Sequence, residues 1–106
     1  QYTIKPKGFF SFGLVRQAKG SPERLIEIEN KDPEQRLELL GAALEDLNRP
    51  SKHYRLEVRE GTAGKIELVM QIRPGAPQGL IRGNIVLRLS HPKAPRQVIG
   101  FSASVR

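Results

Sequence analysis

The chain of 106 residues contains no cysteine, no tryptophan and a single methionine. Without cysteine, the fold has no disulfide, no zinc site built from thiolates and no thiol nucleophile. The absence of cysteine does not indicate the cellular compartment. Two tyrosines and four phenylalanines are the only aromatic residues. With so few aromatic residues, a binding site based on an aromatic cage or on base stacking is not expected.

Long apolar runs are also missing. Neither end of the sequence has an apolar segment long enough for a signal peptide or a membrane span, and the chain starts at Gln1 rather than Met. We therefore expect a piece of a longer protein. A hydrophobic content of 38% with 27% charged residues is ordinary for a soluble globular domain. At this length one core is expected, so residues 1–106 are predicted to form a single domain.

Positive charge is in excess, with a formal net charge of +7 and a pI near 10.3. Such an excess favours polyanions such as nucleic acid, anionic lipid or acidic polysaccharide. The basic stretches His53–Arg59 and His91–Arg96 are, however, interrupted by apolar residues, Glu or Pro. This spacing weakens a nucleic-acid function, because such sites use contiguous basic patches.

What the second half of the chain does contain is a regular series of short segments rich in branched residues and separated by Gly and Pro turns. The turns are predicted at 48–51, 60–64, 73–79 and 90–95. Between them the pattern predicts four β-strands, at Tyr54–Val58, Lys65–Ile72, Gly83–Leu89 and Val98–Val105.

The first half is predicted to be β as well. Phe10, Phe12 and Leu14 share one face of an extended segment and are expected to lie in the core. After a turn at 17–22, Ile26 and Ile28 alternate with glutamates, which predicts a strand with one solvated face.

Residues 34–47 are ambiguous. Their leucines fall at helical spacing, and Asp32 with Pro33 would suit a helix start. Against a helix, Gly41 lies in the middle, at a cost of about 1 kcal/mol relative to Ala, and Leu37 and Leu39 also fit strand alternation. We favour a strand, with a short helix as the alternative. The chain as a whole then has about seven strands, and the predicted fold is an all-β, immunoglobulin-like antiparallel β-sandwich.

Several short segments stand out in their order along the chain: Phe12-Gly13-Leu14-Val15, Ile28-Glu29-Asn30, Tyr54–Val58, Pro74-Gly75, Gly79, Gly83–Val86, Ser90-His91-Pro92 and Pro95. Together they resemble a family of bacterial envelope Ig-like modules of unknown function, related to the Hydin and major-sperm-protein type of sandwich. In these modules a phenylalanine-glycine-x-valine start leads to a strand that ends in asparagine, and a hairpin with histidine-proline precedes the last strand. Two departures are the absence of the cysteine motif of some relatives and a leucine-rich third strand at 37–47.

The resemblance implies a non-enzymatic spacer or protein-interaction module inside a larger bacterial protein of the cell envelope or secreted space. Its partners would be neighbouring domains or another protein. We expect a monomer with no cofactor and no small-molecule substrate.

No residue pattern predicts a catalytic, cofactor-binding or metal site. His91 is interpreted as a turn residue whose side chain bonds to nearby backbone, and His53 has no Asp or Cys at ligand spacing. Glu27 and Glu29 are interpreted as a solvated strand face rather than an acid–base pair. The serines lack a nucleophile-elbow context, and the glycine-rich 61–64 segment lacks the ending of a phosphate loop.

The alternative function is polyanion binding. Four arginines on or beside the predicted strands would supply the contacts if one sheet gathered them on its solvent face. A second mode of association is pairing of a partner strand with the last strand, if that strand lies at a sheet edge. The candidate polyanion contacts are Arg55, Arg73, Arg82 and Arg88.

Overall fold

The computed structural model describes residues 2–32, 34, 36–60 and 65–106. Within them the chain forms eight β-strands, one 3-10 helix (η1, Ser51–His53) and an isolated bridge between Arg16 and Gly20. The strands are β1 Tyr2–Lys5, β2 Phe9–Val15, β3 Arg24–Asn30, β4 Leu39–Glu45, β5 Tyr54–Glu60, β6 Lys65–Ile72, β7 Gly79–Leu89 and β8 Arg96–Val105.

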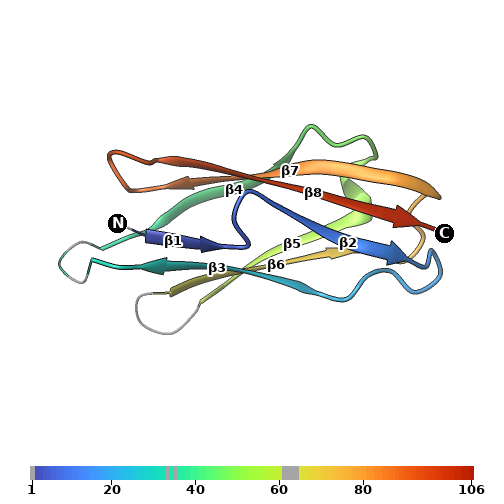
Figure 1. Cartoon of the computed structure of the whole chain (residues 1–106), viewed down its shortest axis with the longest axis horizontal. Helices are drawn as coiled ribbons and strands as arrows, with labels where there is room; N and C mark the ends of the chain where they lie inside the picture. Colours follow the sequence, from blue (N-terminus) through green and yellow to red (C-terminus); the bar gives the residue numbers. More distant parts are fainter. Residues whose placement is uncertain (1, 33, 35, 61–64) are drawn as a thin grey trace.

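The strands form two four-stranded sheets that face each other (Figure 1). Sheet A has the order β1-β3-β6-β5 and sheet B the order β2-β8-β7-β4. The all-β prediction is confirmed. The described residues hold eight strands rather than about seven, because Pro6 and Gly8 divide the N-terminal segment into β1 and β2, which join different sheets.

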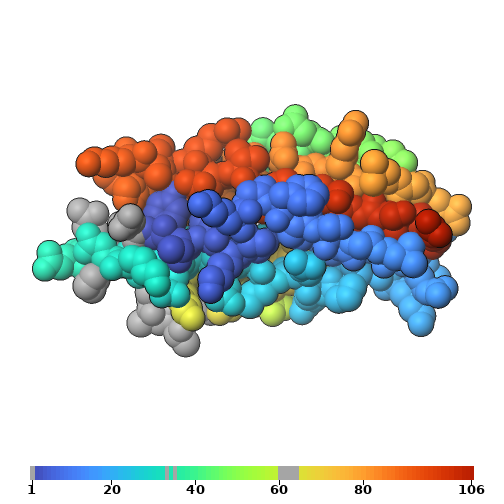
Figure 2. All heavy atoms as spheres, in the orientation of Figure 1, coloured from blue at the N-terminus to red at the C-terminus, as the bar shows by residue number. Residues whose placement is uncertain are grey.

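The sequence analysis predicted a wholly antiparallel sandwich, and this prediction is wrong for one strand pair. β2 pairs with β8 in parallel, whereas the other strand pairs are antiparallel. In Figure 2 the N-terminal segment runs along one side of the molecule, between the C-terminal strand and the segment that contains β3. This crossing segment places β2 beside the last strand of the chain.

The molecule is elongated, with extents of 47 × 24 × 19 Å. Strands of both sheets run along the long axis, and β1 begins near one end while the C-terminus lies at the other (Figure 1). The 90–95 turn between β7 and β8 lies at the end where β1 begins, and the 16–23 loop between β2 and β3 lies at the opposite end.

Alternating side chains of both sheets fill the space between the layers. Ile26 and Ile28 of β3 are fully buried, as their alternation predicted, and Phe101 of β8 is 1% exposed. Removal of each such side chain from water contributes roughly 1.5–3 kcal/mol before entropy is subtracted. The core also contains Phe10, Val15, Leu68, Met70, Ile72, Ile81, Ile85, Leu87, Leu89, Ile99, Ala103 and Val105.

The prediction for the core face of β2 is wrong at one residue. Phe10 is buried and Phe12 packs partly against the core, but Leu14 is 60% exposed. The register between β2 and β8 shifts between Ser11 and Leu14, where Gly13 has φ of +69°. Because such a bulge reverses the alternation, Val15 becomes the buried residue and Leu14 faces solvent.

For the leucine-rich 34–47 segment the strand prediction is confirmed over Leu39–Glu45, which forms β4 and pairs with β7, while Leu37 lies before the strand. Leu39 and Leu44 pack against the core. A Cβ at Gly41, the residue that argued against a helix, would lie 3.1 Å from Nη2 of Arg88. Glycine there leaves room for the Arg88 guanidinium on the outer side of the sheet.

The last strand is not an edge strand. β8 lies between β2 and β7, and it pairs with β7 over ten residues. The sheet edges among the described strands are β1, β5, β2 and β4. The expected partner-strand site at the C-terminus is therefore wrong, because β2 already occupies that side of β8. The predicted turn at 61–64 lies outside the described residues.

Candidate functional site

The four candidate arginines lie on two different sheets. Arg55 is on β5 of sheet A, and Arg73 follows β6 of the same sheet, whereas Arg82 and Arg88 are on β7 of sheet B. Contrary to our expectation, the fold therefore does not gather these four guanidiniums on one sheet face. Polyanion binding by these residues stays a prediction.

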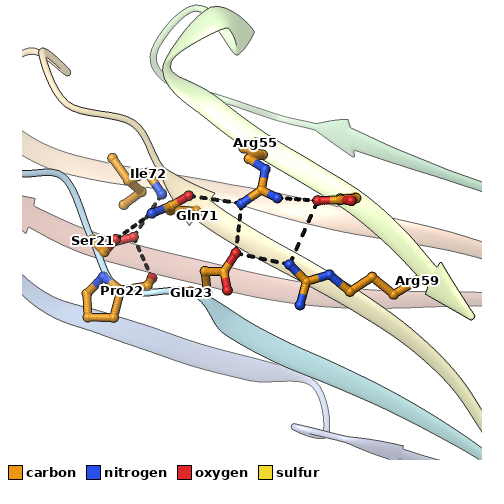
Figure 3. A network of polar contacts seen from close by, with 8 residues as sticks. Ser21, Pro22, Glu23, Arg55, Arg59, Gln71 and Ile72 are labelled. Carbon is orange, nitrogen blue, oxygen red and sulfur yellow. Dashed lines mark hydrogen bonds and ion pairs between the residues drawn. The ribbon is translucent and has the colours of Figure 1, made fainter. Parts of the chain in front are cut away.

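Arg55 is the centre of a polar network on sheet A (Figure 3). Its Nη1 donates to Oε2 of Glu23 at 2.7 Å, and its Nη2 donates to Glu57. Arg59 Nη2 donates to the same Glu23 oxygen at 3.2 Å. Two arginines thus share one carboxylate that comes from the loop before β3.

The network changes the ionisation of its members. The hydrogen bond from Arg55 is the main reason that the pKa of Glu23 is lowered, with the charge of Arg59 adding to it and desolvation partly opposing it. The pKa of Arg55 is raised in turn, chiefly by its hydrogen bond to Glu23. Both groups are therefore held in their charged forms. An incoming anion would have to compete with two carboxylates for Arg55.

A buried serine anchors the same loop to β6. Ser21 is 4% exposed, and its Oγ accepts the N–H of Ile72 at 2.8 Å. The N–H of Ser21 donates to the Ile72 carbonyl at 2.9 Å, and Gln71 Nε2 donates to the Ser21 carbonyl at 3.0 Å. The sequence indicated only a turn serine at this position, because the contact joins residues far apart in the chain.

Arg73 covers a backbone carbonyl at the free edge of β5. Its Nε donates to the carbonyl oxygen of Tyr54 at 3.2 Å, and its N–H donates to the carbonyl of His53 at 2.8 Å. The first bond occupies a backbone acceptor at the start of an edge strand. Covering such groups limits unwanted strand pairing.

The histidines do not come together as a site. His91 Nδ1 accepts the N–H groups of Lys93 at 3.2 Å and Ala94 at 3.1 Å, which confirms the interpretation that it stabilises its own turn. Its ring lies edge-on to Tyr2, with centroids 5.4 Å apart. His53 lies in η1. In the part of the chain that the structure describes, no three His, Asp or Glu side chains gather closely enough to hold a metal ion.

Glu27 and Glu29 lie on the outer side of β3, opposite the buried isoleucines, as predicted. Lys31 Nζ donates to Glu29 at 2.8 Å, and this hydrogen bond lowers the pKa of Glu29. A general acid near neutral pH needs a raised pKa, so this carboxyl is tuned in the wrong direction for acid catalysis.

No family model matches the chain, and no curated protein matches it. Among the described residues no helix is long and apolar enough to span a membrane.

Proposed function

We propose that this chain is an immunoglobulin-like, non-enzymatic module that acts as a spacer and protein-interaction unit within a larger bacterial envelope protein. The observation that carries the proposal is the placement of the two chain ends, with β1 beginning near one end of a 47 Å body and the C-terminus at the other (Figure 1). A unit entered at one end and left at the other sets a distance between the domains on either side.

The end that holds the C-terminus is well connected, which supports a stiff spacer. The N–H of Gln17 donates to the carbonyl of Arg106 at 2.8 Å, and the N–H of Arg106 donates to the carbonyl of Val15 at 2.9 Å. Gln17 also accepts from the N–H of Gly75 and donates through Nε2 to the Ala76 carbonyl. The last residue is thereby tied to β2 and, through Gln17, to the loop before β7.

The immunoglobulin-like assignment is supported by the two packed four-stranded sheets and by the N-terminal segment, which contributes a strand to each of them. The envelope location rests on the resemblance of the Phe12–Val15, Ile28–Asn30 and Ser90–Pro92 segments to bacterial envelope modules.

The test uses the parent protein with fluorophores on the domains that flank this chain. Single-molecule energy transfer should give one narrow distance distribution. Replacement of residues 2–106 by a Gly-Ser linker of equal length should broaden it, because such a linker is a flexible coil. Equal widths would contradict the spacer function, and recovery of the parent protein in the cytoplasmic fraction would contradict the envelope location.

Polyanion binding through Arg55, Arg73, Arg82 and Arg88 has less support, because two of these side chains already bond within sheet A. It is tested by titration with heparin or duplex DNA at two salt concentrations. Affinity that falls steeply with salt would favour it over the interaction function.

A further inference from the structure

The two outer faces of the sandwich differ in chemistry. On sheet A the paired outer positions carry both signs of charge, as in the pair Arg59 and Glu67 and the pair Glu29 and Lys65. The outer face of sheet B, here called the B face, carries neither lysine nor this alternation. Its members are Phe9, Ser11 and Leu14 of β2; Arg96, Val98, Gly100, Ser102 and Ser104 of β8; Leu80, Arg82, Asn84, Val86 and Arg88 of β7; and Gly41, Ala43 and Glu45 of β4.

Apolar side chains are concentrated on the B face. Leu14 and Leu80 lie on either side of Ser104, because both are paired with it, and they are 60% and 58% exposed. Phe9 is 57% exposed and Val98 37%. Four of the seven exposed large apolar side chains of the described residues are therefore on this one face. They form two groups, Leu14 with Leu80 beside Ser104 and Phe9 with Val98 near Gly100. Exposed apolar side chains grouped on a monomer surface favour an interaction site.

The B face has small residues along β8 and a hollow beside them. Glycine and serine occupy much of the β8 row, and a hollow of about 310 Å³ lies among Phe9, Asp46, Arg82, Gly83, Asn84, Gly100 and Phe101. A Cβ at Gly100 would be 3.1 Å from Cδ1 of Phe9, so the Phe9 ring lies against the β8 backbone beside the hollow. A side chain that enters from a partner would meet an aromatic ring and have a guanidinium nearby.

The charge of the B face is unbalanced. Arg88 is paired directly opposite Arg96, and like charges in such positions repel each other. Within the described residues the side chains of Arg82, Arg88 and Arg96 have neither an ion pair nor a hydrogen bond. Asp46 accepts from Asn84 at 2.9 Å, and Glu45 is the one carboxylate among the members of the face.

From this arrangement we infer that the B face docks a protein segment whose apolar anchor side chain enters the hollow and whose carboxylates meet Arg82, Arg88 and Arg96. The inference rests on the proposed interaction function and names its surface and partner chemistry. Arginine and aromatic residues without lysine are the composition typical of protein interfaces.

Other occupants fit less well. A second copy that met this face with its own B face would bring six unpaired arginines together. Nucleic acid would be expected to use a longer basic stripe without exposed leucines. The partner that complements the face is an acidic protein segment with an aromatic or aliphatic residue among its carboxylates.

The experiment presents a random twelve-residue peptide display library to the immobilised 106-residue chain, and then measures the affinity of the synthesised consensus peptide by calorimetry. We expect enriched peptides to combine an aromatic or aliphatic residue with Asp or Glu. Arg88→Glu and Phe9→Ala should each weaken binding by about tenfold or more. Lys65→Glu is the matched control, because it makes the same charge change on the outer face of sheet A, and it should change affinity by less than about twofold.

Each of the other outcomes overturns the inference. Peptides that bind Arg88→Glu as well as the unchanged chain would place the interaction elsewhere and leave the proposed function standing. Failure to enrich any peptide would reject the B face as a docking surface, while the distance measurement in the parent protein would still decide the spacer function. Tighter binding of a 20-nucleotide DNA or of anionic vesicles than of the consensus peptide would assign the face to polyanions. The melting temperature of each variant is measured first, as a control that the variant is folded before its affinity is compared.

Discussion

At the scale of single residues, Tyr54 is the clearest source of lost stability. It is 4% exposed and its ring lies edge-on to Phe101, with centroids 5.5 Å apart. Its hydroxyl oxygen is buried without a hydrogen-bond partner in the described residues, and burial raises its pKa. A buried polar group left without a partner costs about 1–3 kcal/mol.

Tyr54→Phe should therefore stabilise the protein. The substitution keeps the ring contact and removes the unpaired hydroxyl, so we expect the free energy of unfolding to rise by about 1 kcal/mol. Urea unfolding followed by circular dichroism measures the change, with Tyr2→Phe as the control. Tyr2 donates its hydroxyl to the Ala94 carbonyl at 2.6 Å and accepts from Gln97, so its loss should destabilise. A destabilising effect of Tyr54→Phe would show that the hydroxyl has a partner.

At the scale of strands, the bulge in β2 decides which of two neighbouring residues supports the core. Val15 is 2% exposed, whereas Leu14 is 60% exposed. We expect Val15→Ala to lower the free energy of unfolding by about 2 kcal/mol and Leu14→Ala to change it by less than about 0.5 kcal/mol. Thermal and chemical unfolding of the two variants compares them directly. The reverse order would mean that β2 continues its alternation through Gly13 without a bulge.

The loop before β3 should lose part of its attachment in acid. The pKa of Glu23 is lowered in the folded state, so its contribution to stability is present above its unfolded pKa of about 4.3 and is lost as the pH falls through the folded pKa. Glu23→Gln should therefore lower the melting temperature at pH 7 and have little effect below about pH 3. Melting temperatures across this pH range test the expectation. Glu34→Gln, a change at an exposed carboxylate outside the network, serves as the control, and a pH-independent effect of Glu23→Gln would contradict the ionic role.

How far the sequence predicts the strands depends on how local their signals are. β6 spans Lys65–Ile72 as predicted, because its branched residues and flanking turns define it without reference to other strands. The division of the N-terminal segment between two sheets, and the position of β8 inside sheet B, depend on pairings between distant parts of the chain. Hydrophobic alternation carries no information on which strand lies next to which.

The same limit applies to the candidate sites. Arg55 was identified from its position on a predicted strand, but its partner Glu23 comes from a loop 32 residues earlier. Arg96 was not among the candidates, because only the β7–β8 register places it opposite Arg88. The turn role of His91 was predicted correctly because its Nδ1 accepts hydrogen bonds from N–H groups only two and three residues later in the chain.

At the scale of the whole molecule, the net charge of +7 is distributed unevenly. Carboxylates interleave with the cations on the outer face of sheet A, while three arginines of the B face have no partner among the described residues. An excess of positive charge in a composition is therefore compatible with a specific acidic docking partner as well as with a polyanion. The proposed acidic partner rests on the register of the sheets, which gathers these arginines beside exposed apolar side chains, and not on the composition.

A spacer function requires that the elongated molecule hold a fixed length. The chain has no cysteine of its own, so Lys19→Cys in the 16–23 loop and Lys93→Cys in the 90–95 turn allow spin labels to be placed only at opposite ends of the long axis (Figure 1). Pulsed electron resonance should give a single narrow distance peak. Adding Ser21→Ala should broaden it, because Ser21 Oγ holds the loop to β6 through its bond from Ile72. A broad or double peak in the protein without Ser21→Ala would mean that the unit does not hold a fixed length, and a spacer function would then lose its physical basis.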